Sequence, residues 1–252
     1  KIAVALWTLF LVAVGLAQPI TAQDAQRFFP KADLMKIGVY YYPEQWPESA
    51  WDRDFAKMAG LGFEFTHFAE FAWGFLEPSD GVFEFGWLDR AVDLASKHGL
   101  KVILCTPTPC PPAWMGEKHP EIYLVGGDGR RLEHGTRANG SLANDAFVRY
   151  AKRIVAELGR RYGQDSRVWG WQLDNEPSAP ADYSPSARAK FQAWLKAKYG
   201  TVEALNKAWG GNFWSTRYGS FEQVLIPNEN LFGEDALSPH ALLDFRRFTA
   251  DT

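Results

Sequence analysis

The stretch VWGWQLDNEP, residues 168–177, decides the interpretation of the fold. Its apolar, Trp-rich beginning predicts a short buried strand over Val168–Asp174, and Pro177 stops that strand directly after Asn175 and Glu176. A carboxylate and an amide would then lie at the carboxyl end of a strand, where barrel enzymes keep their catalytic residues. A bare Asn-Glu-Pro is also typical of a solvated turn, but the apolar run before it favours a functional site.

Three earlier segments repeat this pattern of a strand followed by a helix. The ranges 36–42, 63–69 and 100–105 are β-branched, aromatic or nearly all apolar, and they predict three further strands. Apolar residues at helical spacing follow them at 51–59, 87–95 and 147–158, and another such run follows the fourth strand at 184–200. Further helices are predicted at 202–209 and from Ser238-Pro239 onward. Unbroken alternation of this kind indicates an α/β fold with a parallel sheet.

An open doubly wound sheet fits the alternation as well as a closed barrel does. A dinucleotide-binding sheet has a Gly-rich turn after its first strand, whereas this sequence has PEQW at 43–46. Polar and aromatic residues follow all four strands, which favours a (β/α)8 TIM barrel. Eight strands at this spacing need more than the 252 residues present. We therefore expect an incomplete, C-terminally truncated barrel domain over residues 35–252, with about the first four to five βα units.

The N-terminus has the pattern of an export signal. Lys1 precedes an apolar run that ends in small residues, which predicts a signal peptide over residues 1–23, cut after Ala17 or Ala22, and then a connector over 24–34. An N-terminal membrane anchor is the alternative. We expect a secreted or periplasmic protein without a membrane span after cleavage.

Composition excludes some partners. A formal net charge of -3 and a pI near 6.0 give no basic surface for nucleic acid or anionic membranes. Most of the 11 Trp, 18 Phe and 9 Tyr residues should fill the core, and some Trp rings could stack on sugar rings. Cys105 and Cys110 lie five apart in a Pro-rich loop, and whether they pair is open. That loop runs from 106 to about 143, and its first part, 106–114, has too many prolines for regular structure.

Six blocks of sequence resemble one known family. They are YYPEQW at 41–46, AEFAW at 69–73 with LEP at 76–78, TPT at 106–108 with PPAW at 111–114, HPE at 119–121, QLDNE at 172–176, and WG at 209–210 with FW at 213–214. Together they resemble the catalytic domain of glycoside hydrolase family 42, the β-galactosidases, from about residue 36 to the end.

The resemblance implies a (β/α)8 barrel that cleaves terminal β-D-galactosides with retention of configuration, by double displacement between two carboxylates. Glu176 matches the acid/base, Asn175 its galactose-binding neighbour, and Arg137 a substrate-binding arginine. Trp214 matches a tryptophan of the sugar subsite, and Glu70 is expected to contact substrate. The nucleophile would be a Glu beyond residue 252.

Two expectations concern the carboxylates themselves. Strand alternation would put Asp174 on the same side as Glu176, which makes Asp174 a rival. An apolar, aromatic site should raise the pKa of Glu176, as an acid/base requires.

The sequence departs from the family pattern at two places. Many members have a zinc-binding cysteine cluster after the Asn-Glu pair, but ADYSPS at 181–186 has no Cys, so we predict no metal and no cofactor. Many have Arg where His67 stands, and His67 is either a substrate contact or a core residue. The resemblance also allows a homotrimer. Two alternatives are another retaining β-glycosidase of the same clan, such as a β-glucosidase or mannanase, and an inactive carbohydrate-binding barrel.

Overall fold

The computed structural model describes residues 35–176, 181–229 and 238–252, and residues 37–252 pack as one unit. The predicted signal peptide and connector lie outside the described residues. None of the helices in the described residues has the length and apolar character needed to cross a membrane.

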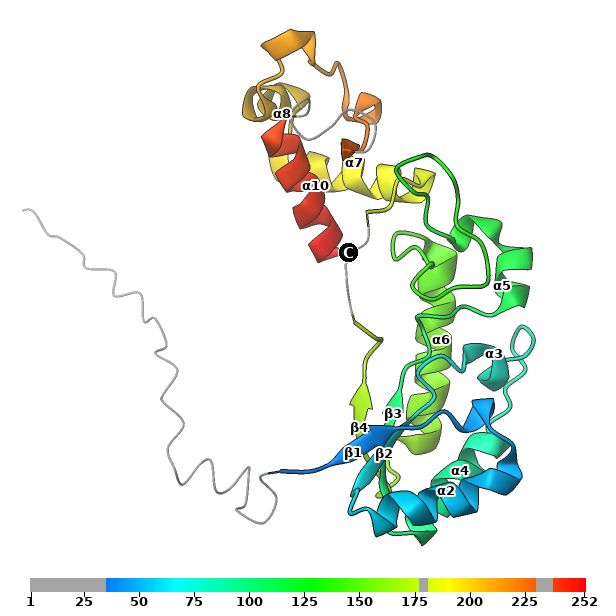
Figure 1. The fold of residues 1–252 in the computed structure, drawn as a ribbon. Helices are drawn as coiled ribbons and strands as arrows, with labels where there is room; N and C mark the ends of the chain where they lie inside the picture. Colours follow the sequence, from blue (N-terminus) through cyan, green and yellow to red (C-terminus); the bar gives the residue numbers. More distant parts are fainter. Residues whose placement is uncertain (1–34, 177–180, 230–237) are drawn as a thin grey trace, which may run out of the picture. The chain divides into compact units, whose positions relative to one another are not determined.

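Four parallel strands form the sheet, in the order β1-β2-β3-β4 (Figure 1). Their bounds are β1 (Gly38–Tyr40), β2 (Phe65–Phe68), β3 (Lys101–Cys105) and β4 (Val168–Gln172). Val39 lies opposite Thr66, and Thr66 lies opposite Val102. The predicted strand order along the chain is thus confirmed, although every strand is shorter than predicted. β4 ends at Gln172, two residues before Asp174, whose positive φ of 59° takes the backbone out of the extended region.

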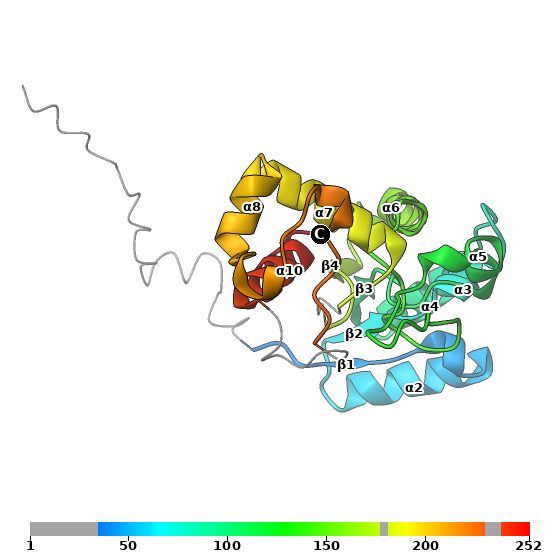
Figure 2. The same ribbon diagram turned by 90° about the horizontal axis from the view of Figure 1, so that it is seen from above.

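Three helices cover one side of this sheet in both ribbon views (Figures 1 and 2). They are α2 (Glu48–Gly60), α4 (Gly86–Lys97) and α6 (Asp145–Tyr162). Each presents an apolar stripe at helical spacing, for example Leu88, Ala91 and Val92 in α4, all fully buried. Asn144 caps the start of α6, since its side chain accepts a hydrogen bond from the Phe147 N–H at 3.0 Å.

The first hydrophobic core lies between these helices and the sheet. Its fully buried members include Phe55 of α2, Phe68 of β2, Leu104 of β3 and Ile154 of α6. Burial on this scale holds the strands at a fixed register, because a slip by one residue would turn each apolar side chain to the wrong face. Truncating Leu104 to alanine should cost about 2–5 kcal/mol.

The loops that follow β2 and β3 contain more regular structure than predicted. α3 (Trp73–Leu76), α5 (Ala113–Lys118) and η3 (Pro120–Ile122) lie in them, and η2 (Pro43–Gln45) follows β1. The prediction that 106–114 is irregular is therefore wrong at its end. Pro112 is the N-cap of α5, a position that needs no backbone N–H, so the prolines begin the helix instead of preventing it.

A second hydrophobic core is built by the helices that follow β4. They are α7 (Pro185–Tyr199), α8 (Val202–Trp209), η5 (Phe221–Gln223) and α10 (Pro239–Asp251). η4 (Phe213–Ser215), between α8 and η5, has no buried residue. Phe191 of α7 is fully buried in this core against Phe245 and Phe248 of α10. Gly200 and Gly210 end α7 and α8 with φ of 73° and 71°, which glycine adopts without a steric penalty. The helices predicted at 184–200, at 202–209 and from 238 onward are confirmed.

The prediction of a buried fourth strand is wrong. Trp169 of β4 is 47% exposed, and its neighbours are only partly buried. β4 pairs with β3 alone among the described strands, so its other edge has no partner strand within the described residues.

Candidate active site

Polar side chains from three strand ends meet in one hydrogen-bonded network. Tyr42, just after β1, donates to one carboxylate oxygen of Glu70 at 2.5 Å, and Gln172 Nε2 of β4 donates to the other at 3.3 Å. The Tyr40 hydroxyl donates to Gln172 Oε1 at 3.0 Å. Ala69 precedes Glu70 with φ of 71°, so the chain turns sharply where β2 ends. Glu70 is buried and both its oxygens are bonded, and direct contact with substrate stays a prediction for this residue.

His67 is buried next to this network. Its imidazole contacts the Cys105 thiol, with 3.5 Å between Nδ1 and Sγ, and meets the Tyr40 ring edge-on at 4.2 Å between centroids. Burial lowers the pKa of His67 and so favours the neutral imidazole, while the Glu70 carboxylate acts in the opposite direction. Burial raises the pKa of Cys105 to about 12, and both cysteines are free thiols. Whether His67 also contacts substrate stays a prediction.

The turn after β4 is held in an uncommon backbone conformation. Asp174 and Glu176 have φ of 59° and 45°, a left-handed region that costs a non-glycine residue about 1–2 kcal/mol. The Asp174 N–H donates to Thr106 Oγ1 at 2.7 Å, and the Thr108 hydroxyl donates to Asp174 Oδ2 at 3.0 Å. The Asn175 N–H donates to Asp174 Oδ1 at 2.6 Å. Strained backbone held by several bonds is characteristic of functional sites.

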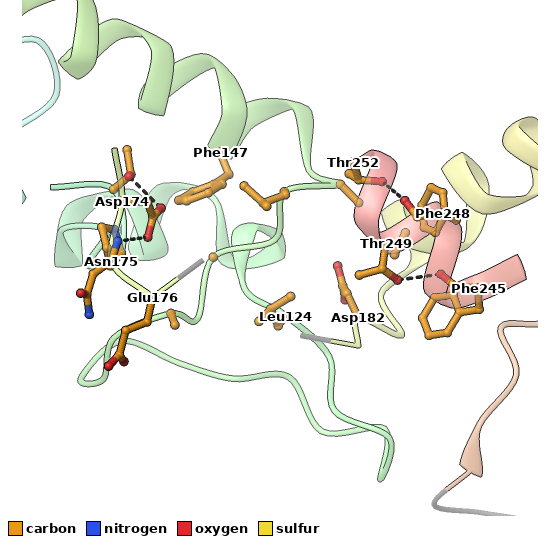
Figure 3. Close-up of a pocket in the computed structure, with 17 residues that line it drawn as sticks. Leu124, Phe147, Asp174, Asn175, Glu176, Asp182, Phe245, Phe248, Thr249 and Thr252 are labelled. Carbon is orange, nitrogen blue, oxygen red and sulfur yellow. Dashed lines mark hydrogen bonds between the residues drawn. The ribbon is translucent and has the colours of Figure 1, made fainter. Parts of the chain in front are cut away.

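These contacts fix the position of the Asp174 carboxylate. Its carboxylate folds back onto the turn, while Glu176 points away from it (Figure 3). Strand alternation does not apply because the strand has already ended at Gln172. Asp174 therefore holds the turn with its carboxylate, and its role as a rival to Glu176 stays a prediction.

Glu176 and Arg137, 39 residues apart, form an ion pair with 2.8 Å between Oε2 and Nη2. The guanidinium of Arg137 also lies over the Phe71 ring, 5.8 Å from its centroid. The Glu176 side chain is 73% exposed, so the apolar enclosure predicted for it is not provided by the described residues. Asn175 lies beside it, and its Oδ1 accepts a hydrogen bond from Gln172 Nε2 at 3.4 Å.

A cavity of about 260 Å³ opens next to the turn (Figure 3). Asp174, Asn175 and Glu176 line one part of it, and the aromatic rings of Phe147, Phe245 and Phe248 line another. Carboxylate, amide and apolar walls converge here, the combination expected of a small-molecule site.

Trp214 is not brought to this cavity. It lies in η4 with φ of 52°, its ring is 69% exposed, and it packs against Phe213 at 4.6 Å between centroids. The sugar-subsite role of Trp214 thus stays a prediction from resemblance.

Sequence reasoning missed several residues that build the site. Tyr42, Gln172, Thr106 and Thr108 hold Glu70 and the turn, and each lies inside a sequence block already recognised at 41–46, 106–108 or 172–176. Because they lie at or just after the ends of predicted strands, their positions could have indicated that they belong to the site.

Glu44 was also missed as a site residue. Burial, together with the negative charge of Glu70, raises the pKa of Glu44 to about 7. Its Oε2 is buried without a hydrogen-bond partner in the described structure. Glu44 therefore changes charge near neutral pH beside the network.

Asp182 occupies the segment in which the sequence lacks cysteines. Its Oδ1 accepts from the Val125 and Ser184 N–H groups at 3.2 and 2.9 Å, and its Oδ2 accepts from the Ser141 and Ser184 hydroxyls at 2.5 and 3.0 Å. A buried carboxylate thus fastens the start of α7 to the long loop. Within residues 35–176, 181–229 and 238–252, no group of three or more His, Cys, Asp and Glu residues is placed to hold a metal ion.

The sequence and the fold of this chain are similar to those of known proteins. The family model for glycoside hydrolase family 42, described as β-galactosidase, matches residues 40–252. β-Galactosidase Bga of Halorubrum lacusprofundi is 40% identical over 221 residues, covering 86% of this chain and 31% of that protein. β-Galactosidase BgaA of a Thermus species is 42% identical over 218 residues, covering 85% of this chain and 33% of that protein.

Solved structures agree with these matches. The β-galactosidase from the psychrophilic Marinomonas ef1 superposes with a TM-score of 0.81 at 39% identity, over 86% of this chain and 33% of that one. The Halorubrum enzyme superposes with a TM-score of 0.79. The predicted α/β fold is confirmed, with a four-stranded parallel sheet that corresponds to part of a (β/α)8 barrel. The chain spans about a third of the length of the relatives it matches, and it belongs to glycoside hydrolase family 42, the β-galactosidase family.

Proposed function

We propose that the protein containing this chain hydrolyses terminal β-D-galactosides with retention of configuration, and that Glu176 is its acid/base. The observation that carries the proposal is the position of Glu176, exposed directly after β4, in contact with Arg137 and beside Asn175 in one cavity. Family membership and relatives named β-galactosidases support the sugar.

Glu176 first acts as an acid in this mechanism. It protonates the leaving glycosidic oxygen while a second carboxylate, which the resemblance locates beyond residue 252, attacks the anomeric carbon. In the second step Glu176 removes a proton from water, and that water displaces the enzyme carboxylate. Two inversions at the anomeric carbon give β-galactose with retained configuration.

Arg137 is paired with Glu176 before substrate arrives, with 2.8 Å between Nη2 and Oε2. Glu176 must leave this contact to reach the glycosidic oxygen. We propose that substrate hydroxyls draw Arg137 away from Glu176, since the guanidinium has further donors to offer. Asn175 then offers its amide to a neighbouring sugar hydroxyl, a contact that strengthens in the transition state.

The test is turnover of 4-nitrophenyl β-glycosides by the full-length protein. We expect the galactoside to have the highest kcat/KM in a panel with the β-glucoside and β-mannoside, and proton NMR to show β-galactose as the first product. A preferred glucoside or mannoside would favour the alternative β-glycosidase, and binding without turnover would favour an inactive carbohydrate-binding barrel. Appearance of α-galactose first would exclude retention.

We also propose that the protein is exported and forms a homotrimer. The charged start and apolar run within residues 1–23 support export, and the family resemblance supports the trimer. Mass spectrometry of the expressed protein should find a new N-terminus after Ala17 or Ala22. An intact N-terminus in the membrane fraction would instead indicate an anchor, and sedimentation equilibrium tests the trimer.

A further inference from the structure

A second cavity, of about 620 Å³, lies beside the ion pair of Glu176. Its walls come from α3 and the residues just before it, from the start of α5, and from residues 134–137 of the long loop. Arg137 is the link, because it lines this cavity and also bonds Glu176. Small-molecule sites have volumes of about 300–1,000 Å³, so the cavity is of a suitable size for a ligand.

Three aromatic rings in the cavity wall are fixed by their own contacts. Phe71 stacks on Tyr42 with 6.1 Å between ring centroids and 8° between planes. Trp114 donates its indole N–H to the Glu77 carbonyl at 2.8 Å and meets Tyr150 edge-on. Phe75 contacts Trp87 edge-on at 6.4 Å and is still 55% exposed.

The buried Glu77 carboxylate, behind this wall, is held by several hydrogen bonds and an ion pair. Glu77 is fully buried, and its carboxylate accepts from the Trp73 indole at 3.0 Å, from the Gly81 N–H at 2.9 Å, and from Arg153 of α6. A paired and fully bonded buried carboxylate resists displacement, since breaking one partner leaves a charge uncompensated. The rings are thus positioned before any ligand arrives, which reduces the ordering cost of binding.

The chemistry of the walls selects an uncharged ring with one apolar face. None of the described lining residues is acidic, and the only full charge, on Arg137, is already paired with Glu176. His134, Thr136 and Arg137 supply hydrogen-bond donors along one side. Aromatic platforms with donors at their edge suit a sugar ring, whose C–H face is apolar and whose hydroxyls project outward.

We propose that this cavity, which we call the aromatic pocket, binds the leaving-group sugar of a galactosyl disaccharide. The inference rests on the proposed function, because the leaving group departs from Glu176 and the pocket adjoins the ion pair of that residue. Arg137 lies between the pocket and Glu176 and would contact both halves of the substrate.

Two substitutions test the pocket from opposite directions. Phe75→Ala removes an exposed platform at little cost to the fold. Gly74→Leu adds bulk to the wall: a Cβ on Gly74 would lie 3.8 Å from Pro112 Cβ, an ordinary contact, and the longer side chain would extend into the space. Leu61→Ala is the matched control, since Leu61 is 77% exposed and does not line the pocket.

Binding is measured by calorimetry on the full-length protein with 4-thiolactose, whose sulfur linkage resists hydrolysis, and with methyl β-thiogalactoside. We expect thiolactose to bind the unmodified protein and the Leu61→Ala variant about three- to tenfold more tightly, and both pocket variants to lose that advantage. Equal binding of the two ligands by the unmodified protein, or an advantage that survives both substitutions, would overturn the proposal.

Kinetics separate this proposal from the proposed function. Galactosyl fluoride has no leaving-group sugar, so kcat/KM for it should stay within about twofold in both pocket variants while kcat/KM for lactose falls about three- to tenfold. Equal falls for both substrates would overturn the pocket. Failure of the unmodified protein to hydrolyse either substrate would overturn the proposed function, whereas the calorimetric result would still decide the pocket.

Discussion

Asp174 holds the turn that carries Glu176. Its carboxylate bonds the Thr108 hydroxyl and the Asn175 N–H, and its own N–H bonds Thr106. These three bonds compensate for the left-handed backbone of Asp174 and Glu176 in the turn after β4. The direction in which Glu176 points is therefore set by side chains of the loop after β3.

Asp174→Asn should reduce activity without unfolding the protein. The amide nitrogen cannot accept the Thr108 proton, so the turn loosens, and kcat/KM should fall roughly tenfold, about the effect of losing one hydrogen bond to a charged group. Steady-state kinetics on aryl galactosides measure this. Asp93→Asn, on the exposed face of α4, is the control and should have no effect. Activity equal to that of the unmodified protein would show that Asp174 does not hold the turn.

Glu44 should make stability depend on pH. Its pKa is raised to about 7 in the folded state from an ordinary value of 4.5, so the folded state binds the proton more tightly between these values. Stability should thus fall as pH rises from 4.5 to 7, because the ionised form is disfavoured only in the folded state.

Glu44→Gln removes this dependence. At pH 8 the free energy of unfolding of the variant should exceed that of the unmodified protein by on the order of 2 kcal/mol, and the variant should unfold at a higher temperature. Near pH 4.5 the two proteins should not differ. Thermal unfolding across that range tests the point. Glu48→Gln is the contrasting control, since Arg90 lowers the pKa of Glu48 and its loss should not stabilise. A difference that is constant with pH would contradict the assignment.

At the scale of elements, Asp182 holds the start of α7 against the long loop after β3. Its two oxygens accept four hydrogen bonds, two from hydroxyls and two from backbone N–H groups. A buried carboxylate therefore anchors residues 181–186, a stretch without cysteines.

Asp182→Asn should weaken this fastening. An amide accepts on one oxygen only, which leaves buried partners unsatisfied and should cost about 1–3 kcal/mol. Urea denaturation gives the change in free energy of unfolding. Asp128→Asn, a half-exposed residue of the same long loop, serves as the control. If both variants unfold at the same urea concentration, Asp182 is not a structural anchor.

Periodicity predicted the elements well but their ends poorly. Helix stripes and strand runs were visible because a core must be apolar at fixed spacing. The carboxyl end of β4 was mispredicted because hydrogen bonds from a distant loop, such as that from the Asp174 N–H to Thr106, decide it. Such bonds join residues 68 apart in the sequence and leave no local pattern. The start of α5 was mispredicted because proline at an N-cap can begin a helix.

At the scale of the molecule, two hydrophobic cores position the residues of the candidate active site. The first core, around Phe55 and Leu104, places the strand ends, and the second, around Phe191, supplies α10 and its rings to the cavity beside Glu176. The pairing of Glu176 with Arg137 could be anticipated only through family resemblance, because nothing local relates residues 39 apart. Burial was predicted wrongly for Trp169 and Glu176, because an apolar run does not show how far neighbouring elements cover a strand.

The central claim, that Glu176 is the acid/base, predicts a dependence on the leaving group. Glu176→Ala in the full-length protein should lower kcat/KM about 10²- to 10⁴-fold for lactose, which needs protonation of its leaving oxygen, and far less for 2,4-dinitrophenyl β-galactoside, which does not. Added azide, which needs no general base, should restore turnover and yield β-galactosyl azide. Equal loss on both substrates with no azide product would contradict the account.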